Sequence, residues 1–72
     1  MYYVYIIQSV SSKKLYFGRT SSLENRLKEH NSGSNFSTKN DRPWGYVYIE
    51  GYKSEKDAIS RELKLKNYGN AR

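Results

Sequence analysis

A run of strand-forming residues, Tyr2–Val10, sets how this chain begins to fold. Tyrosine, valine and isoleucine favour extended backbone, and the run is much shorter than the roughly 20 apolar residues that span a membrane. It also lacks the basic start and the small-residue cleavage site of a secretory signal. Polar residues 11–14 follow as a turn, and Leu15–Arg19 forms a second short strand. The first twenty residues therefore predict an antiparallel hairpin.

Gly18 lies in the second of these strands and has no side chain to pack. A glycine inside a strand marks a position that another group approaches closely, whereas a glycine at the end of a strand simply precedes a loop. The sequence leaves both interpretations open.

A first helix is expected to begin at Ser21, because Glu24 three residues later completes a capping box. Asn31 and Gly33 carry the signals that end a helix. The polar stretch Asn31–Arg42 predicts a loop that is long for so small a domain, and long loops are often functional.

The rest of the chain predicts one more strand and one more helix. Gly45–Tyr52 has strand character, and period-two alternation puts Tyr46 and Tyr48 on the same side. Ser54 caps a second helix that runs to about Asn67. The expected fold is therefore α+β, a three-stranded antiparallel sheet flanked by helices in the order β-β-α-β-α. We expect residues 1–72 to form a single domain.

Composition points to a polyanionic partner. The chain carries 13 Lys and Arg against 7 Asp and Glu, a net charge of +6. A basic surface of this kind attracts nucleic acid, and we expect no membrane partner and a cytoplasmic location. The alternative is a basic surface that only aids solubility. The absence of cysteine excludes disulfides and thiolate metal sites.

Tyrosine dominates the aromatic residues, with eight in 72 positions. A domain of this size buries only roughly 60% of its unfolded surface, so its core is thin. A tyrosine ring fills such a core while its hydroxyl stays available to water or a ligand. The thin core and long helix faces also leave room for a protein partner or a second copy of the chain.

The second helix carries a carboxylate where an apolar side chain is expected. Helical periodicity gives it an inward stripe made of Ala58, Ile59, Leu63 and Leu65. Glu62 and Lys66 fall inside that stripe. A carboxylate there is costly unless it is paired or binds a metal. The other interpretation is an ordinary Glu62–Lys66 ion pair at a partly wet helix edge.

The first helix repeats this pattern with a histidine. His30 falls on the apolar face formed by Leu23 and Leu27, and Arg26 flanks it one turn earlier. Such a histidine is either a satisfied core group or a proton carrier. Two tyrosines of the hairpin, Arg26, His30 and Glu62 are expected to meet over the sheet.

That set of side chains suits phosphodiester hydrolysis. Arg26 would neutralise charge on the scissile phosphate. Glu62 would hold one divalent cation, Mg²⁺ or Mn²⁺, which needs only one or two carboxylates besides phosphate oxygens and water. A tyrosine hydroxyl would orient or deprotonate the attacking water, provided that nearby charge lowers its pKa. His30 would shuttle a proton or stabilise the transition state.

The same residues form a recognisable pattern. The triplet at residues 3–5, the spacing from Tyr5 to Tyr16, the triplet at residues 16–18 and then Arg26 resemble the GIY-YIG nuclease superfamily. The segments LYFGRTSSLENRLKEHNSG and RPWGYVYIEGYKSEKDAISRELKLK are similar to its small stand-alone bacterial members. They also resemble the N-terminal nuclease module of the excinuclease that acts in DNA repair. The resemblance covers nearly the whole chain, and it implies nucleic acid as the substrate, with DNA expected rather than RNA.

The resemblance implies roles position by position. Tyr5 and Tyr16 match the tyrosines of the two triplets, and Gly18 matches the glycine of the second. Arg26 matches the helix arginine, His30 the histidine or tyrosine one turn later, and Glu62 the glutamate that binds one divalent cation. Family members usually continue with a further basic helical segment, so the resemblance implies a shortened C-terminus. Asn67 and Asn70 are candidates for the polar role of that segment.

Other functions stay open at this stage. One is a nucleic-acid-binding module of the same fold without catalysis, and another is a protein-interaction domain. Phosphate contacts alone give affinity with little specificity. Besides Gly18, the residues expected to contact phosphate are Arg19, Lys28, Lys39, Arg42, Lys64 and Lys66.

Overall fold

The computed structural model describes the backbone of residues 1–70 and the side chains of residues 1–67. Its strands and helices follow the predicted order. They are β1 (Tyr2–Ser9), β2 (Leu15–Thr20), α1 (Leu23–Ser32), β3 (Trp44–Tyr52) and α2 (Glu55–Asn70). The predicted loop between α1 and β3 contains a short 3-10 turn, Lys39–Asp41. The helix expected to end near Asn67 continues to Asn70.

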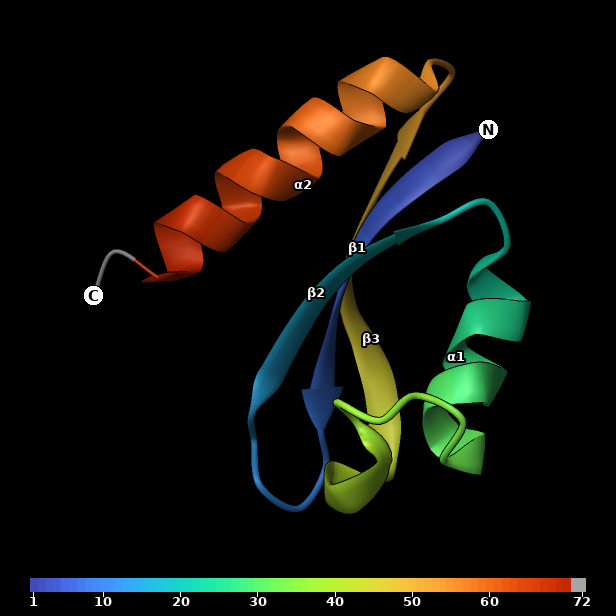
Figure 1. The fold of residues 1–72 in the computed structure, drawn as a ribbon, viewed down its shortest axis with the longest axis vertical. Coiled ribbons are helices and arrows are strands. Elements are labelled where there is room, and N and C mark those ends of the chain that lie inside the picture. Colours follow the sequence, from blue (N-terminus) through green and yellow to red (C-terminus); the bar gives the residue numbers. More distant parts are fainter. Residues whose placement is uncertain (71–72) are drawn as a thin grey trace.

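The three strands form one antiparallel sheet in the order β2-β1-β3, so β1 is central. The helices lie on opposite sides of this twisted sheet, α1 near β3 and α2 across β1 and β2 (Figure 1). This arrangement confirms the α+β prediction of a three-stranded antiparallel sheet flanked by helices.

The register of the sheet assigns each residue to a helix-covered face. Tyr5 lies opposite Gly18, and both belong to the face that α1 covers. Val4 lies opposite Arg19 on one side and Glu50 on the other, and these three belong to the face that α2 covers. A shift of one residue would exchange the two faces, because side chains alternate along a strand.

A β-bulge in β3 overturns one expectation about its faces. The register shifts between Ile6 and Ile7, so that Ile6 lies opposite Tyr48 and Ile7 lies opposite Tyr46. The extra residue, Val47, breaks the period-two alternation. Tyr46 therefore faces α1 and Tyr48 faces α2, although strict alternation puts them on the same side.

The two helix starts differ in their caps. In α1 the N-cap is Ser22 without a side-chain capping bond, so the predicted capping box from Ser21 to Glu24 is wrong. Thr20 bonds the backbone of Ser22 instead and shifts the start by one residue. Gly33 ends α1 in the left-handed conformation, at φ 86°, as predicted.

In α2, the hydroxyl of Ser54 accepts the backbone N–H of Asp57 at 3.4 Å. This contact confirms the predicted start of the second helix, because a serine N-cap satisfies an N–H group of the first turn.

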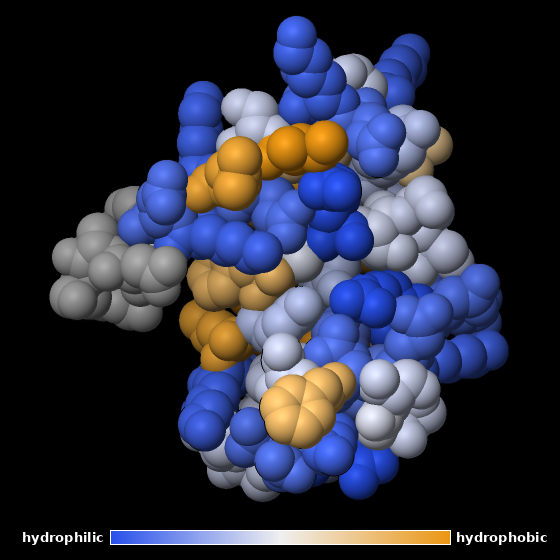
Figure 2. Space-filling view, in the orientation of Figure 1, coloured by the Kyte–Doolittle hydropathy of each residue, from blue (hydrophilic) through white to orange (hydrophobic). Residues whose placement is uncertain are grey.

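The inward face of α2 is rotated relative to the predicted stripe. Ala58 is buried and Leu65 is half-buried, but Ile59 and Leu63 are 38% and 57% exposed. Apolar residues consequently show as a short stripe over α2 on an otherwise hydrophilic surface (Figure 2). The physical reason is that the sheet offers charged partners here. Glu50 and Arg19 pair with two side chains of α2, and these pairs turn the helix.

The core is small and rich in aromatic rings, as the composition predicts. Tyr5, Ile7 and Trp44 are its buried members. Half-buried side chains from both layers pack against them, namely Tyr16, Leu23, Leu27 and Tyr46. This core lies between the sheet and α1, and it also contains polar groups that carry chemistry.

Gly18 is a site of close approach and not the end of a strand. A Cβ built on it would lie 2.4 Å from the Tyr5 hydroxyl oxygen and 2.5 Å from the adjacent ring carbon. The Tyr5 ring therefore lies directly over the glycine across the strand pair. A side chain at residue 18 would push that ring out of its place.

We expect Gly18→Ala to lower the free energy of unfolding by about 1–3 kcal/mol, because it overpacks a buried contact. Urea titration of the wild type and the variant measures this effect. Gly45→Ala is the matched control, since a Cβ there meets no atom within 4 Å. Equal stability of the Gly18 variant and the wild type would show that the Tyr5 ring does not lie over the strand.

Candidate active site

The hydroxyl of Tyr5 joins α1 to the central strand. Tyr5 is 0% exposed, and its hydroxyl accepts a hydrogen bond from Nε of Arg26 at 3.1 Å. The same hydroxyl lies 2.9 Å from Nε2 of His30. Arg26 and His30 are four residues apart on α1, so both side chains project from one side of the helix toward the sheet.

These contacts favour one tautomer of His30. Because Tyr5 accepts from Arg26, its own proton is available to donate to Nε2 of His30. In that tautomer Nδ1 of His30 carries the ring proton and faces the hydroxyl of Thr38, 2.9 Å away. His30 has a partner on each ring nitrogen, and it is also 0% exposed.

Two further tyrosines, Tyr16 and Tyr46, pack against the rings of His30 and Tyr5. Tyr16 is half-buried on β2, and its ring packs edge-on against His30 with centroids 4.9 Å apart. The ring of Tyr46 packs edge-on against Tyr5 at 5.5 Å. Four of the five expected catalytic residues therefore come together on the α1 face: Tyr5, Tyr16, Arg26 and His30.

Burial weakens Tyr5 as an acid. It raises the pKa of the Tyr5 hydroxyl to about 12, and the opposing effect of Arg26 is smaller. The expectation that nearby positive charge would lower the pKa of a site tyrosine is therefore wrong for Tyr5. At neutral pH this hydroxyl stays protonated, which suits it to hold Arg26 and His30.

His30 is neutral, whereas Arg26 carries a positive charge. Burial, together with the charge of Arg26, lowers the pKa of His30 and keeps it neutral. Arg26 donates to Tyr5 and pairs with Glu29 at 2.7 Å, and these bonds raise its pKa. Its guanidinium is the fixed positive charge of this face, held through Nε and one terminal nitrogen.

Glu62 lies on the other face of the sheet. Its side chain is 13% exposed, and its two oxygens pair with Arg19 at 2.9 Å and with Lys66 at 3.0 Å. Arg19 shares the face of Val4, opposite to that of Tyr5. The expectation that Glu62 meets the hairpin tyrosines and Arg26 over one face is therefore wrong, because α2 packs on the reverse side. The inward position of Glu62 itself is as predicted.

The donor set at Glu62 suits a cation that arrives with its substrate. In the described part of the chain, no three histidine, aspartate or glutamate side chains gather into a metal cage. A single carboxylate is enough for Mg²⁺ when phosphate oxygens and water complete its shell. Arg19 and Lys66 disfavour a bare cation but attract the phosphate that would accompany it.

The other expected phosphate contacts lie in several places. Lys39 sits over the Phe36 ring, with Nζ 4.9 Å from its centroid, and Arg42 donates from Nε to the Lys39 carbonyl. Lys28 pairs with Glu24 at 3.8 Å. Lys64 is exposed on α2.

The two asparagines expected to replace the further helical segment are at the end of α2. Asn67 is exposed there, whereas the side chain of Asn70 lies outside the described residues.

The sequence did not reveal two structural partners. Thr38 is buried although it lies in a polar loop, and nothing in the local pattern marks it.

Arg61 donates two hydrogen bonds to Glu50 at 2.8 and 3.1 Å, which attaches α2 to β3. Hydrogen bonds from Arg61, Tyr48 and Tyr52 lower the pKa of Glu50 to about 2. Helical periodicity did not mark Arg61 as facing the sheet, because α2 is rotated away from the predicted stripe.

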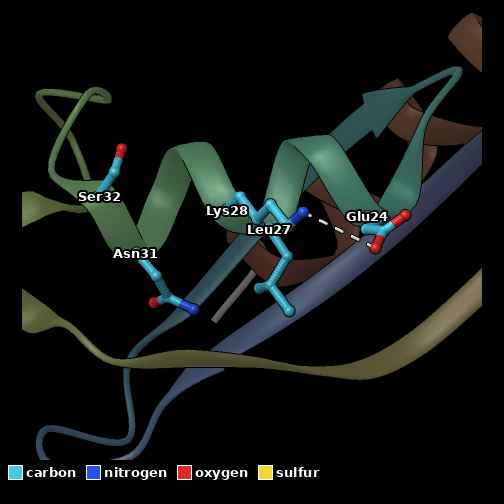
Figure 3. A pocket seen from close by; sticks show the side chains of 5 residues that line it. All are labelled: Glu24, Leu27, Lys28, Asn31 and Ser32. Carbon is cyan, nitrogen blue, oxygen red and sulfur yellow. Dashed lines mark ion pairs between the residues drawn. The ribbon is translucent and has the colours of Figure 1, made fainter.

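A hollow runs along α1 apart from the tyrosine cluster. Its lining comes from Glu24, Leu27, Lys28, Asn31 and Ser32 (Figure 3). None of the expected catalytic residues lines it. Within residues 1–70, no helix combines the length and the apolarity that crossing a membrane requires.

The single histidine gives the stability of the protein a defined pH dependence. The unfolded chain binds a proton near pH 6.5, whereas the lowered pKa of His30 keeps the folded state neutral. Stability is therefore complete above pH 6.5 and falls as the pH drops below it, by at most about 1.4 kcal/mol per pH unit. Urea unfolding at pH 7.5, 6.5 and 5.5 measures this loss, and His30→Gln should remove it.

The chosen pH range excludes the largest carboxylate effect. The stabilising contribution of Glu50 is lost only as the pH falls below 4.5 toward 2. A wild type whose stability does not change between pH 7.5 and 5.5 would contradict a neutral, buried His30.

Comparison with known proteins assigns the chain to a family. The family model of the GIY-YIG catalytic domain matches residues 1–72. A UPF0213 protein of Syntrophus aciditrophicus is 41% identical over 71 residues, 96% of this chain and 80% of the relative. The UPF0213 protein HQ_3675A of Haloquadratum walsbyi is 37% identical over 68 residues, 93% of this chain and 75% of the relative. No solved structure matches significantly. The chain belongs to the GIY-YIG family, whose members are generally nucleases.

Proposed function

We propose that this protein is a metal-dependent endonuclease that hydrolyses phosphodiester bonds of nucleic acid, DNA rather than RNA. The observation that carries the proposal is the guanidinium of Arg26, held between Tyr5 and Glu29 on a face lined with tyrosines. A fixed guanidinium is suited to the charge that develops on a phosphoryl group in its transition state. Membership of a nuclease family supports this assignment.

The two charged clusters flank the edge strand β2. Tyr16 and Arg26 lie on the side that α1 covers, and Arg19 with Glu62 lies on the side that α2 covers. The order β2-β1-β3 leaves one edge of β2 without a strand neighbour. We place the nucleic-acid backbone along this edge, with Gly18, Arg19 and Lys66 as contacts and Lys39 as a more distant one.

Each side chain then has a chemical task. Arg26 neutralises the scissile phosphate. Tyr16, which is half-buried, orients the attacking water, while Tyr5 keeps its proton and holds Arg26 in place. Neutral His30 accepts the hydrogen bond of the Tyr5 hydroxyl, so the Tyr5 oxygen stays turned toward Arg26. Glu62 would hold Mg²⁺ or Mn²⁺ together with a phosphate oxygen, and the bound cation supplies charge neutralisation at that phosphate.

The direct test is cleavage of supercoiled plasmid with Mg²⁺ or Mn²⁺, with and without a chelator. Glu62→Gln keeps the shape of the side chain but removes its charge. We expect it to lower the cleavage rate at least about 100-fold, a loss typical of removing one group that stabilises transition-state charge. Binding of the same DNA, measured by anisotropy, should change little.

Glu55→Gln is the matched control, because Glu55 is exposed at the start of the same helix. It should cleave like the wild type. Equal cleavage by the Glu62 variant would show that another site, or a contaminant, cuts the plasmid.

One observation favours a second function, nucleic-acid binding without catalysis. Both oxygens of Glu62 are already paired with cationic side chains. If Arg19 and Lys66 keep those pairs, no cation enters. Salt-dependent binding with no cleavage under either metal would support this second function. We also propose that a protein partner or a second copy of the chain binds the exposed apolar residues of α2. The proposed location is the cytoplasm.

A further inference from the structure

We propose that Thr38 is a positioning residue, whose hydroxyl selects the His30 tautomer and thereby fixes the direction of the Arg26 guanidinium. This inference rests on the proposed function only for the role of Arg26. The hydrogen-bond geometry stands without it. The chain of contacts runs from the loop between α1 and β3, across α1, to the central strand.

The direction of the chain is set from both ends, and Arg26 is one of them. An arginine Nε–H only donates, so the Tyr5 oxygen accepts at that contact. The Tyr5 proton then goes to Nε2 of His30, and Nδ1–H of His30 goes to Thr38. The Thr38 hydroxyl proton faces the Asn35 carbonyl oxygen at 3.5 Å. Every donor along this line meets one acceptor.

The opposite tautomer does not fit this site. With a proton on Nε2, His30 would donate to Tyr5, which already accepts from Arg26. The Tyr5 proton would then need a third partner inside a fully buried site. Nδ1 would lose its proton and face a hydroxyl that must reverse its own bond. Among the described residues, no buried side-chain nitrogen or oxygen lacks a hydrogen-bond partner. The tautomer with Nδ1–H also gives each proton of this chain an acceptor.

Thr38 can act as the reference point because its backbone is held by bonds other than the contact with His30. It is buried, and its carbonyl oxygen accepts the indole N–H of Trp44 at 2.7 Å. Its backbone N–H donates to the Asn35 carbonyl at 3.2 Å. The loop is thus anchored to the core before it meets His30. The Thr38 hydroxyl donates its proton to the Asn35 carbonyl, so its oxygen is left to accept from Nδ1–H. Loss of this hydroxyl removes that acceptor and leaves the loop backbone bonds in place.

Nitrogen NMR of the single histidine tests this proposal directly. In the wild type, Nδ1 should show the shift of a protonated ring nitrogen, and Nε2 that of an acceptor. Thr38→Val is nearly isosteric and lacks the acceptor, so we expect the tautomer to change or become mixed. The Nε–H signal of Arg26 should move with it and exchange faster with water. Thr38→Ser should restore both signals.

Cleavage kinetics of the same variants test whether Thr38 affects catalysis. We expect Thr38→Val to lower kcat by about ten- to hundred-fold, as for a misplaced catalytic group, with KM nearly unchanged. Thr38→Ser should recover most of kcat. Ser37→Ala is the control, because Ser37 is the exposed neighbour in the same loop. It should match the wild type in both arms.

The outcomes separate the two proposals. A wild-type His30 protonated on Nε2 overturns the positioning role, and this measurement does not depend on whether any variant folds. A Thr38→Val protein that keeps Nδ1–H and an unchanged Arg26 signal also overturns it. A wild type that shows the expected tautomer but cleaves no nucleic acid supports the positioning chain and refutes the endonuclease assignment.

Discussion

The buried hydroxyl of Tyr5 is the contact on which the α1 side of this molecule depends. It lies over Gly18, accepts from Arg26 and bonds His30, so it joins β2, β1 and α1 at one point. A phenylalanine ring would fill the same space but would leave the Arg26 N–H and the His30 nitrogen without a partner in a dry site. Burial raises the pKa of Tyr5 to about 12, so this hydroxyl is a weaker acid than an ordinary tyrosine, and the charges beside it are those of the Arg26–Glu29 pair.

Charge is divided between the two faces of the sheet. On the α1 side, one guanidinium stands among aromatic rings and a neutral imidazole. On the α2 side, Arg19, Glu62 and Arg61 with Glu50 form paired charges that attach the helix to the sheet. The edge strand β2 carries Tyr16 on the α1 side and Arg19 on the α2 side. A substrate that contacts both Arg26 and Glu62 must therefore extend past the edge of β2, because the two side chains lie on opposite faces of the sheet.

Local patterns were reliable where one residue type has one physical use. Tyr-, Val- and Ile-rich runs predicted the strands, Gly33 ended α1, and Ser54 capped α2. Apart from the capping box of Ser21, which failed locally, they failed where partners are distant in sequence. Val47 enters a bulge and reverses the expected faces of Tyr46 and Tyr48, and α2 turns toward Glu50 and Arg19 at the expense of Ile59 and Leu63. Periodicity treats every apolar residue as equally inward, because it carries no information about the sheet beneath.

The sequence by itself determined the order of elements, the basic charge and the placement of Arg26 and His30 on the sheet-facing side of α1, because these follow from propensity, composition and a 3.6-residue period. Tertiary structure alone decided that burial outweighs Arg26 and raises the pKa of Tyr5, that His30 lies against Thr38 and that Glu62 pairs with Arg19 behind the sheet. Burial and hydrogen-bond partners arise between residues far apart in the chain. No local window contains the desolvation or the geometry that sets them.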